Sequence, residues 1–149
     1  MIRKRSYHFL LAFAIAGLLV SVYAFRQHYA PLGQSACNVN TTFNCDLVNH
    51  GPYAEIAGFP VAALGIIGYL AIGLVALQFS KTKDPILGKV LLALCAGGFA
   101  FSLYLSALEE FAIHAWCLVC LASLSCIAGS SLTAIMTYQE YGSVGSGKA

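Results

Sequence analysis

Four long runs of apolar residues, separated by short polar segments, dominate the pattern along the chain. They cover residues 9–25, 56–79, 86–108 and 115–138. At 1.5 Å per residue, helices of this length reach roughly 26–36 Å, enough to cross a hydrocarbon core of about 30 Å. Backbone groups in lipid must be paired within their own segment, which favours helices. The pattern therefore predicts an all-α integral membrane protein with a bundle of four transmembrane helices.

Composition supports a membrane protein and argues against nucleic acid as a partner. The chain has 149 residues, of which 59% are hydrophobic and only 9% are charged. Soluble domains carry about 25% charged residues. The net charge is only +2, and no basic patch is interleaved with aromatic residues. We therefore expect membrane lipid as the surroundings of one domain, residues 1–138.

The positions of the charges predict the orientation in the membrane. Only Arg26 falls on the other side of the predicted spans from the remaining basic residues, which are Arg3, Lys4, Arg5, Lys81, Lys83, Lys89 and Lys148. Because basic residues concentrate in cytoplasmic segments, both termini are expected in the cytoplasm. Residues 26–55 would then form an extracytoplasmic loop, or cap, after the first helix.

Two segments allow further predictions. Residues 139–149 are rich in Gly and Ser and are predicted to be a disordered cytoplasmic tail. Pro85, after the turn formed by residues 81–84, is well placed at a helix start. An alternative for the first apolar run is a cleaved signal peptide, since it has a basic start and "VYA" near its end.

This topology sorts the six cysteines into three groups. Cys37 and Cys45 lie in the outer loop, in "CNVNTTFNC", and Cys117 and Cys120 open the fourth apolar run in "HAWCLVC". The remaining two, Cys95 and Cys126, lie inside apolar segments and are interpreted as small packing residues. Four thiols are thus predicted on the oxidising face of the membrane, where disulfides form.

The helical pair has the features of a reactive dithiol. Cys117 is predicted in the first turn, where unpaired N–H groups and the helix dipole stabilise a thiolate. Cys120 lies three residues later on the same face, so the two sulfurs can form a disulfide. Two alternatives remain open for this pair: buried packing thiols, or a four-thiolate zinc site with Cys37 and Cys45. The loop pair has its own alternative, a static structural disulfide.

The arrangement resembles the vitamin K epoxide reductase family in its bacterial single-domain form. The resemblance rests on the four predicted spans, the loop pair, "GFPVAALG" at 58–65 and "HAWCLVC" at 114–120. It implies that Cys37 meets the thiols of a separate periplasmic thioredoxin-like (DsbA-like) protein and that Cys45 passes electrons to Cys117. Cys120 would then face a quinone, ubiquinone or menaquinone, which serves as the electron acceptor without a metal.

The same resemblance implies a function, a location and two departures from the family. The function is disulfide generation for protein folding by a quinone-dependent oxidoreductase in the bacterial inner membrane, with its active face outside the cytoplasm. Gly51 and Leu124 stand where many relatives have polar groups that hold the ligand, so the quinone's hydrogen-bond partners are unassigned.

Four aromatic residues near the outer helix ends are candidates for the quinone pocket: Phe59, Phe99, Phe111 and Trp116. Trp116 fits equally well as a residue of the interfacial aromatic belt. An alternative for the whole protein is a redox-sensing or scaffold membrane protein whose disulfides are structural.

Overall fold

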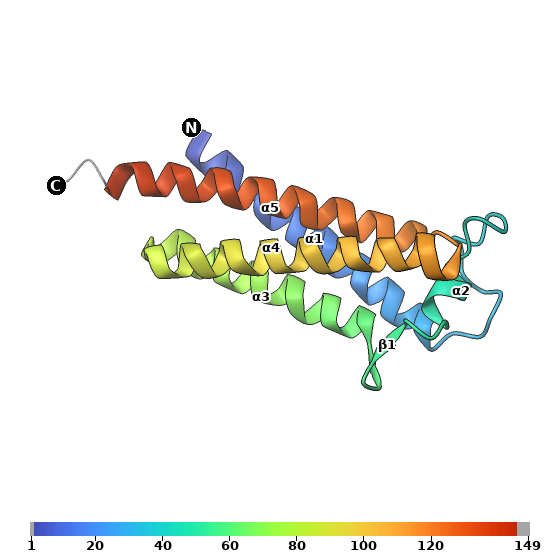
Figure 1. Ribbon diagram of the computed structural model, residues 1–149. Helices are drawn as coiled ribbons and strands as arrows, with labels where there is room; N and C mark the ends of the chain where they lie inside the picture. The colour runs from blue at the N-terminus through green and yellow to red at the C-terminus, as the bar shows by residue number, and fades with distance from the viewer. Residues whose placement is uncertain (1, 146–149) are drawn as a thin grey trace.

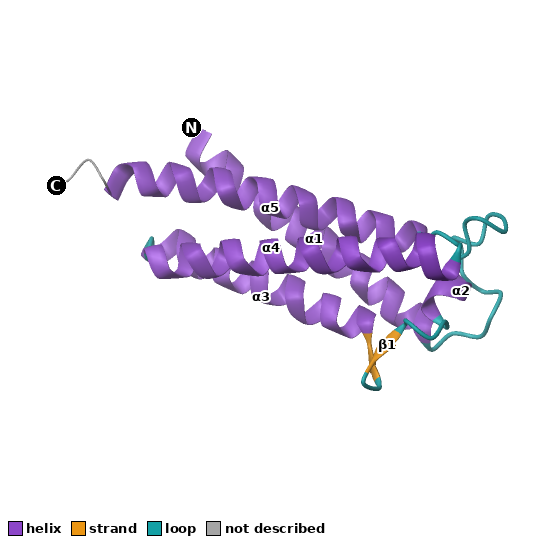
Figure 2. Ribbon diagram, viewed as in Figure 1, coloured by secondary structure: helices purple, strands orange, loops and turns teal. Residues whose placement is uncertain are grey.

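Four long helices and a small cap make up the computed structural model, which describes the backbone of residues 2–145 and the side chains of residues 5–141. The long helices are α1 (Ile2–His28), α3 (Val61–Thr82), α4 (Pro85–Leu108) and α5 (Leu118–Gly145). Each contains a stretch long and apolar enough to cross a membrane. The prediction of an all-α protein with four such helices is confirmed (Figure 2).

The chain ends and the cap lie at opposite ends of the bundle (Figure 1). The cap consists of the segment after α1, the short helix α2 (Cys45–Asn49), and a hairpin of β1 (Glu55–Ile56) and β2 (Phe59–Pro60). The turn between α3 and α4 lies at the end that carries the termini. This arrangement follows from four spans that alternate in direction, with the cap as the long α1–α3 connection and short connections elsewhere.

The second predicted span began too early. Residues 56–60 belong to a β-hairpin, and helix α3 starts only at Val61. Ala57 and Gly58 have positive φ angles of 53° and 83°, which make the tight hairpin turn. Apolar residues in a membrane-proximal hairpin and in a helix look alike by hydropathy, and this is the physical reason for the error.

The fourth predicted span is shifted at both ends. Helix α5 begins at Leu118 rather than at residue 115, and it continues to Gly145. Residues 139–145, predicted as part of a disordered tail, are therefore helical, and residues 146–149 lie outside the described residues. The extension is held by tertiary contacts: Ser6 Oγ donates to Glu140 Oε1 at 3.0 Å, and the ring of Tyr141 packs edge-on against Phe79.

The turn between α3 and α4 follows its local sequence. Lys83 adopts the left-handed conformation after α3, and Asp84 caps α4 by accepting the N–H of Ile86 at 2.9 Å. Pro85 occupies the first helical position, where its missing N–H costs nothing. The predicted helix start at this proline is confirmed.

The helices pack through apolar residues and close approaches at glycines. Leu10, Ile72 and Leu91 are fully buried between the helices. At Gly17 the ring of Tyr69 occupies the space that a Cβ atom would need, and at Gly129 the ring of Phe13 does the same. Such contacts are typical of membrane bundles, where packing rather than water exclusion drives helix association.

Candidate functional site

The loop before α2 is turned back toward the bundle by its own side chains. Asn40 Oδ1 accepts the N–H groups of Thr42 and Phe43 at 2.9 and 2.8 Å, which closes a tight turn. Asn44 then caps α2 by accepting the N–H of Leu47 at 3.0 Å. The first residue of the capped helix is Cys45, so the local sequence sets the direction in which this cysteine enters α2.

A short backbone pairing brings the loop to the start of α5. Phe43 forms a parallel bridge with Trp116. The N–H of Trp116 donates to Thr42 O at 2.7 Å, and the N–H of Asn44 donates to Trp116 O at 3.1 Å. Cys117 directly follows Trp116, and Cys45 comes two residues after Phe43, so the bridge places the two cysteines together.

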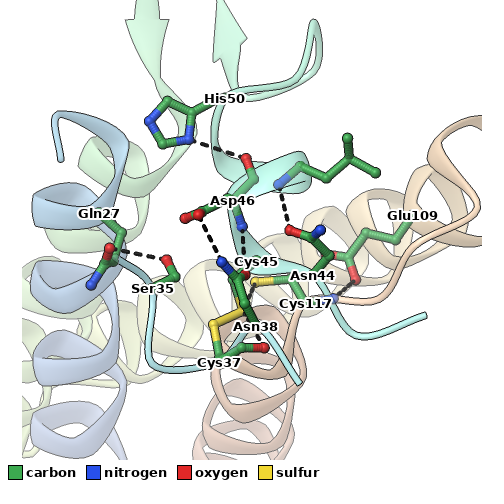
Figure 3. Close-up of a disulfide and its surroundings, with 11 residues drawn as sticks. Gln27, Ser35, Cys37, Asn38, Asn44, Cys45, Asp46, His50, Glu109 and Cys117 are labelled. Atoms are coloured by element: carbon green, nitrogen blue, oxygen red, sulfur yellow. Dashed lines mark hydrogen bonds between the residues drawn. A yellow bond between two sulfur atoms is a disulfide. The ribbon is translucent and has the colours of Figure 1, made fainter. Parts of the chain in front are cut away.

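The four predicted cysteines meet at this point, as Figure 3 shows for three of them. Cys37 and Cys45 form a disulfide. The sulfur of Cys45 lies 3.3 Å from that of Cys117, and both residues are fully buried. The thiols of Cys117 and Cys120 are free and hydrogen-bond to each other. The two couples are therefore in direct contact through Cys45 and Cys117.

Cys117 occupies the residue just before helix α5 rather than its first turn. Its carbonyl oxygen accepts the N–H of Leu121 at 3.0 Å, the first bond of the helix. The hydrogen bond from the Cys120 thiol, aided by the N–H groups of Cys120 and Val119, lowers the pKa of Cys117, although burial opposes this. The helix-terminal N–H groups therefore favour a thiolate at Cys117, but the Cys120 thiol contributes more.

Glu109 is the site residue that sequence reasoning missed. Its side chain is buried, with 1% exposed, although it lies at the predicted outer end of the third span. The carboxyl oxygen Oε2 accepts the N–H of Cys117 at 3.0 Å, and the carboxyl also interacts with the Cys120 thiol. The only signal in the sequence was a pair of acidic residues, "EE", directly after an apolar run.

A short π-helix, η1 (Glu109–Ile113), turns the Glu109 side chain toward the cysteines. It continues α4, and His114 ends it in the left-handed conformation with φ of 55°. Single-turn π segments inside or at the end of α-helices are frequent at functional sites. No hydropathy pattern distinguishes such a turn from an ordinary loop.

Asp46 holds the loop around the disulfide. Its carboxylate accepts the N–H of Gly33 and the side-chain amide of Asn38, the latter at 2.7 Å (Figure 3). The pKa of Asp46 is lowered, first by the adjacent Ser35 hydroxyl and further by the hydrogen bonds from Gly33 and Asn38 and by the nearby His50 ring, although burial opposes this. The ionised side chain of Asp46, a residue of α2, thus holds residues 33–38 against this helix through hydrogen bonds.

A mostly apolar cavity of about 190 Å³ lies beside the helical pair, between α1, α3, α4 and α5. Its wall includes the half-buried Cys120, the buried carboxyl of Glu109 and the amide of Asn49. The Asn49 side-chain nitrogen is buried and has no hydrogen-bond partner among the described residues. The cavity therefore brings the sulfur of Cys120 together with two polar groups in an otherwise apolar space.

The four aromatic candidates for a quinone pocket do not line this cavity. Phe59 and Phe111 are 68% and 79% exposed, and Phe99 packs against the helix core. Trp116 takes part in the bridge to the cap. Phe99 lies in the middle of α4 rather than near its outer end. Phe59 and Phe111 belong to the hairpin and to the π-helix, which hydropathy does not show and which set the directions of their side chains.

The remaining two cysteines lie in or beside the helix core, apart from the two couples. Cys95 is buried in the helix core, as expected of a packing residue, and Cys126 is half-buried beside it. Because Cys37 and Cys45 are bonded to each other, the four thiolates of the zinc alternative do not occur together in this structure.

The comparison with protein families agrees with this geometry. Residues 8–135 match the model of the vitamin K epoxide reductase family, and the chain belongs to that family. The match covers α3 and α4 completely, most of α1 and α5, and both cysteine couples. The protein is therefore an oxidoreductase that crosses the membrane several times.

Proposed function

We propose that the protein carries electrons from the thiols of a separate thioredoxin-like protein to a quinone in the membrane and so generates disulfides for protein folding. The observation that carries this proposal is the 3.3 Å separation between the sulfurs of Cys45 and Cys117. Thiol–disulfide exchange needs direct approach of a thiolate to a disulfide sulfur. The two couples meet that requirement without any rearrangement.

The first step is exchange with the partner. One thiolate of the reduced partner attacks Cys37, which is 9% exposed whereas Cys45 is fully buried. The Cys37–Cys45 bond breaks, Cys45 leaves as a thiolate, and a mixed disulfide joins Cys37 to the partner. The second partner thiol attacks this mixed disulfide and frees Cys37. The partner leaves oxidised, and two electrons remain on Cys37 and Cys45.

The second step moves these electrons inward. The Cys45 thiolate attacks Cys117 of a Cys117–Cys120 disulfide, so that Cys120 is released. Cys37 then attacks Cys45, which restores the Cys37–Cys45 disulfide and frees Cys117. The structure has the bonds that result from this step, with the outer disulfide closed and Cys117 and Cys120 reduced. The lowered pKa of Cys117 makes it a good leaving group.

The cavity beside Cys120 fits the head group of a quinone. An apolar protein cavity of about 150 Å³ is enough to hold benzene, and the cavity here measures about 190 Å³. The unpartnered amide nitrogen of Asn49 can donate a hydrogen bond to a quinone oxygen. A quinone bound there supplies an acceptor for two electrons and two protons, and Cys117 and Cys120 re-form their disulfide.

The proposed location places the cap outside the cytoplasm of a bacterial cell, in the inner membrane. Arg5 lies near the start of α1, and Lys81, Lys83 and Lys89 lie around the α3–α4 turn, all at the end of the bundle that carries the termini. Basic residues at that end favour it as the cytoplasmic one. The cysteines would then lie on the oxidising side, where disulfides are made.

The test is quinone reduction by the purified, lipid-reconstituted protein with a reduced thioredoxin-like protein as the electron donor. We expect the wild-type protein to reduce a soluble ubiquinone or menaquinone analogue and Cys120→Ala to lose this activity completely. Cys126→Ala removes a cysteine that takes no part in the proposed electron transfer. It is the control and should keep the activity. Absence of quinone reduction by the wild-type protein would instead support the sensor or scaffold alternative.

The partner is identified by trapping. In a Cys45→Ala variant, Cys37 has no resolving thiol next to it, so its mixed disulfide with a partner persists. We expect one thioredoxin-like protein to be recovered through this bond from the extracytoplasmic compartment. Recovery of cytoplasmic proteins alone would contradict the proposed orientation.

A further inference from the structure

Glu109 is buried among the reacting groups, and one of its oxygens has no partner. Oε2 accepts the N–H of Cys117 at 3.0 Å, and the Cys120 thiol interacts with the carboxyl. Oε1 is buried and has no hydrogen-bond partner among the described residues. Glu109 and Cys120 both line the cavity beside α5. An unpaired buried carboxyl oxygen is costly, so this arrangement calls for an explanation.

Electrostatics limits how many of the three acidic groups carry charge together. Cys117, Cys120 and Glu109 are in mutual contact in a space largely screened from water. Like charges this close oppose one another, which favours a single anion shared by the cluster. The N–H groups of Val119 and Cys120 face the sulfur of Cys117, so the negative charge is best placed there. Cys120 and Glu109 then hold protons.

We propose that Glu109 relays the proton of the Cys120 thiol into the cavity when the Cys117–Cys120 disulfide closes, a role that rests on the quinone chemistry proposed above. One carboxyl oxygen receives the proton from Cys120 Sγ while the other, Oε1, releases a proton into the cavity. Glu109 contacts a reacting sulfur and is therefore a catalytic residue. A carboxyl group can act in this way because its two oxygens exchange roles as donor and acceptor.

The protons and electrons of this step balance. It begins with a Cys117 thiolate, a Cys120 thiol and a protonated Glu109. The Sγ–Sγ bond forms, and the two electrons pass to the quinone as the oxidant. One of the two protons required comes from Cys120 through Glu109. The other comes from water at the cap, because Cys117 has already lost its own proton. Glu109 ends as it began.

Neighbouring glutamates offer a matched pair of variants. Glu109→Gln keeps an oxygen that can accept the Cys117 N–H, but an amide cannot relay a proton. Glu110→Gln makes the same change one residue later in η1, at an exposed position. Glu109→Asp retains an acid and serves as the rescue variant. Each would be purified as the full chain in lipid, and its folding checked by thermal unfolding.

The decisive measurement is a single turnover of the pre-reduced protein with a soluble quinone. We expect Glu109→Gln to slow disulfide closure by about 100-fold, the lower range for loss of acid–base catalysis. Glu109→Asp should recover part of the rate, and Glu110→Gln should match the wild type. The rate in the wild-type protein should also fall in D₂O, and this solvent isotope effect should change in Glu109→Gln.

Two measurements without turnover distinguish a relay from a structural role. Trp116 is the only tryptophan and adjoins Cys117, so quenching of its fluorescence reports quinone binding to the oxidised protein. We expect the quinone Kd to be unchanged in Glu109→Gln. Infrared difference spectra between the dithiol and disulfide states, driven by the thiol oxidant diamide, should contain a shift of a carboxyl C=O band in the wild type and in Glu110→Gln but not in Glu109→Gln, because the protonated Glu109 loses its contact with the Cys120 thiol when the disulfide forms.

The outcomes separate this role from the proposed function. If wild-type protein reduces the quinone and Glu109→Gln does so equally fast, the relay is wrong and the thiol–quinone chemistry stands. An equal loss in Glu110→Gln, or a weakened quinone Kd that accounts for the whole loss in Glu109→Gln, would also overturn it. If the wild-type protein reduces no quinone, the proposed function itself fails.

Discussion

The Cys37–Cys45 disulfide and the Cys117/Cys120 thiol pair lie in contact but are held by different interactions. The outer disulfide is positioned by polar groups close to it in sequence, above all the ionised Asp46, the turn closed by Asn40 and the helix cap formed by Asn44. The inner pair is positioned by the end of an apolar bundle, with Glu109 as its buried polar neighbour.

Because different interactions hold the two couples, we expect the couples to differ in mobility. Short-range hydrogen bonds at the surface of a loop can open locally without unfolding the protein, whereas packed helices open only with their neighbours. A partner protein must reach Cys37, which is nearly buried, so local opening of the cap suits the outer couple. The inner couple must hold its distance to the cavity, and a rigid helix start provides that.

We expect the largest effect from Cys37→Ala, which removes the outer disulfide and leaves both cysteines of the inner pair in place. In Cys37→Ala the Cys45 thiol has no disulfide partner and lies against Cys117, so attack on the Cys117–Cys120 disulfide leaves a Cys45–Cys117 bond that only the reverse attack by Cys120 can break. We expect electron transfer from the protein partner to stop and this bond to accumulate, as measured by peptide mapping under non-reducing conditions.

Two results would contradict this expectation for the outer couple. A small dithiol that reaches the inner pair directly should still support quinone reduction by Cys37→Ala, and its failure would mean that the substitution damages the inner pair as well. Absence of any Cys45–Cys117 bond would mean that the 3.3 Å contact is not used for exchange.

A smaller effect tests the packing of the bundle alone. In Gly17→Ala the new methyl group would overlap the ring of Tyr69, whose hydroxyl donates to Ser123 O at 2.7 Å. Overpacking in a well-packed core costs about 1–3 kcal/mol, and we expect a loss of about 2 kcal/mol in thermal stability. Gly73→Ala, where no atom lies within 4 Å of the added Cβ, is the control and should not destabilise the protein.

The smallest effect tests the cap alone. Asp46→Asn removes a charged acceptor of several hydrogen bonds, and we expect residues 33–46 to open about 10-fold more often at neutral pH, which corresponds to about 1.4 kcal/mol. Amide hydrogen exchange measures this opening. Asp84→Asn, a change at the opposite end of the bundle, should leave exchange in the cap unchanged.

The pH dependence of the cap follows from the same carboxylate. The pKa of Asp46 is lower in the folded protein than its ordinary value of 3.8. Its contribution to stability is therefore complete above about pH 4 and is lost as the pH falls below 3.8 through the folded-state pKa. Opening of the cap in the wild type should rise in that range, while Asp46→Asn should lack this transition. Equal acid sensitivity in both proteins would assign the effect to another group.

Local sequence patterns were sufficient to predict the number of membrane helices, the helix start at Pro85 and the grouping of four cysteines at one end of the bundle. These features are encoded locally, because hydropathy and proline geometry act over a single segment. The order of the cysteines and the flanking motifs were also sufficient to predict the family to which the chain belongs.

The contacts between groups in the site depend on how segments far apart in the chain pack together. The contact between Cys45 and Cys117 depends on the bridge from Phe43 to Trp116, which joins residues far apart in the chain. The position of Glu109 depends on a π-helix and on packing against the start of α5. The cavity depends on four helices at once, which is why Asn49 and Glu109 line it and the aromatic residues expected there do not. Contacts between distant residues are set by packing between segments, and the hydrophobic periodicity of a single segment does not predict them.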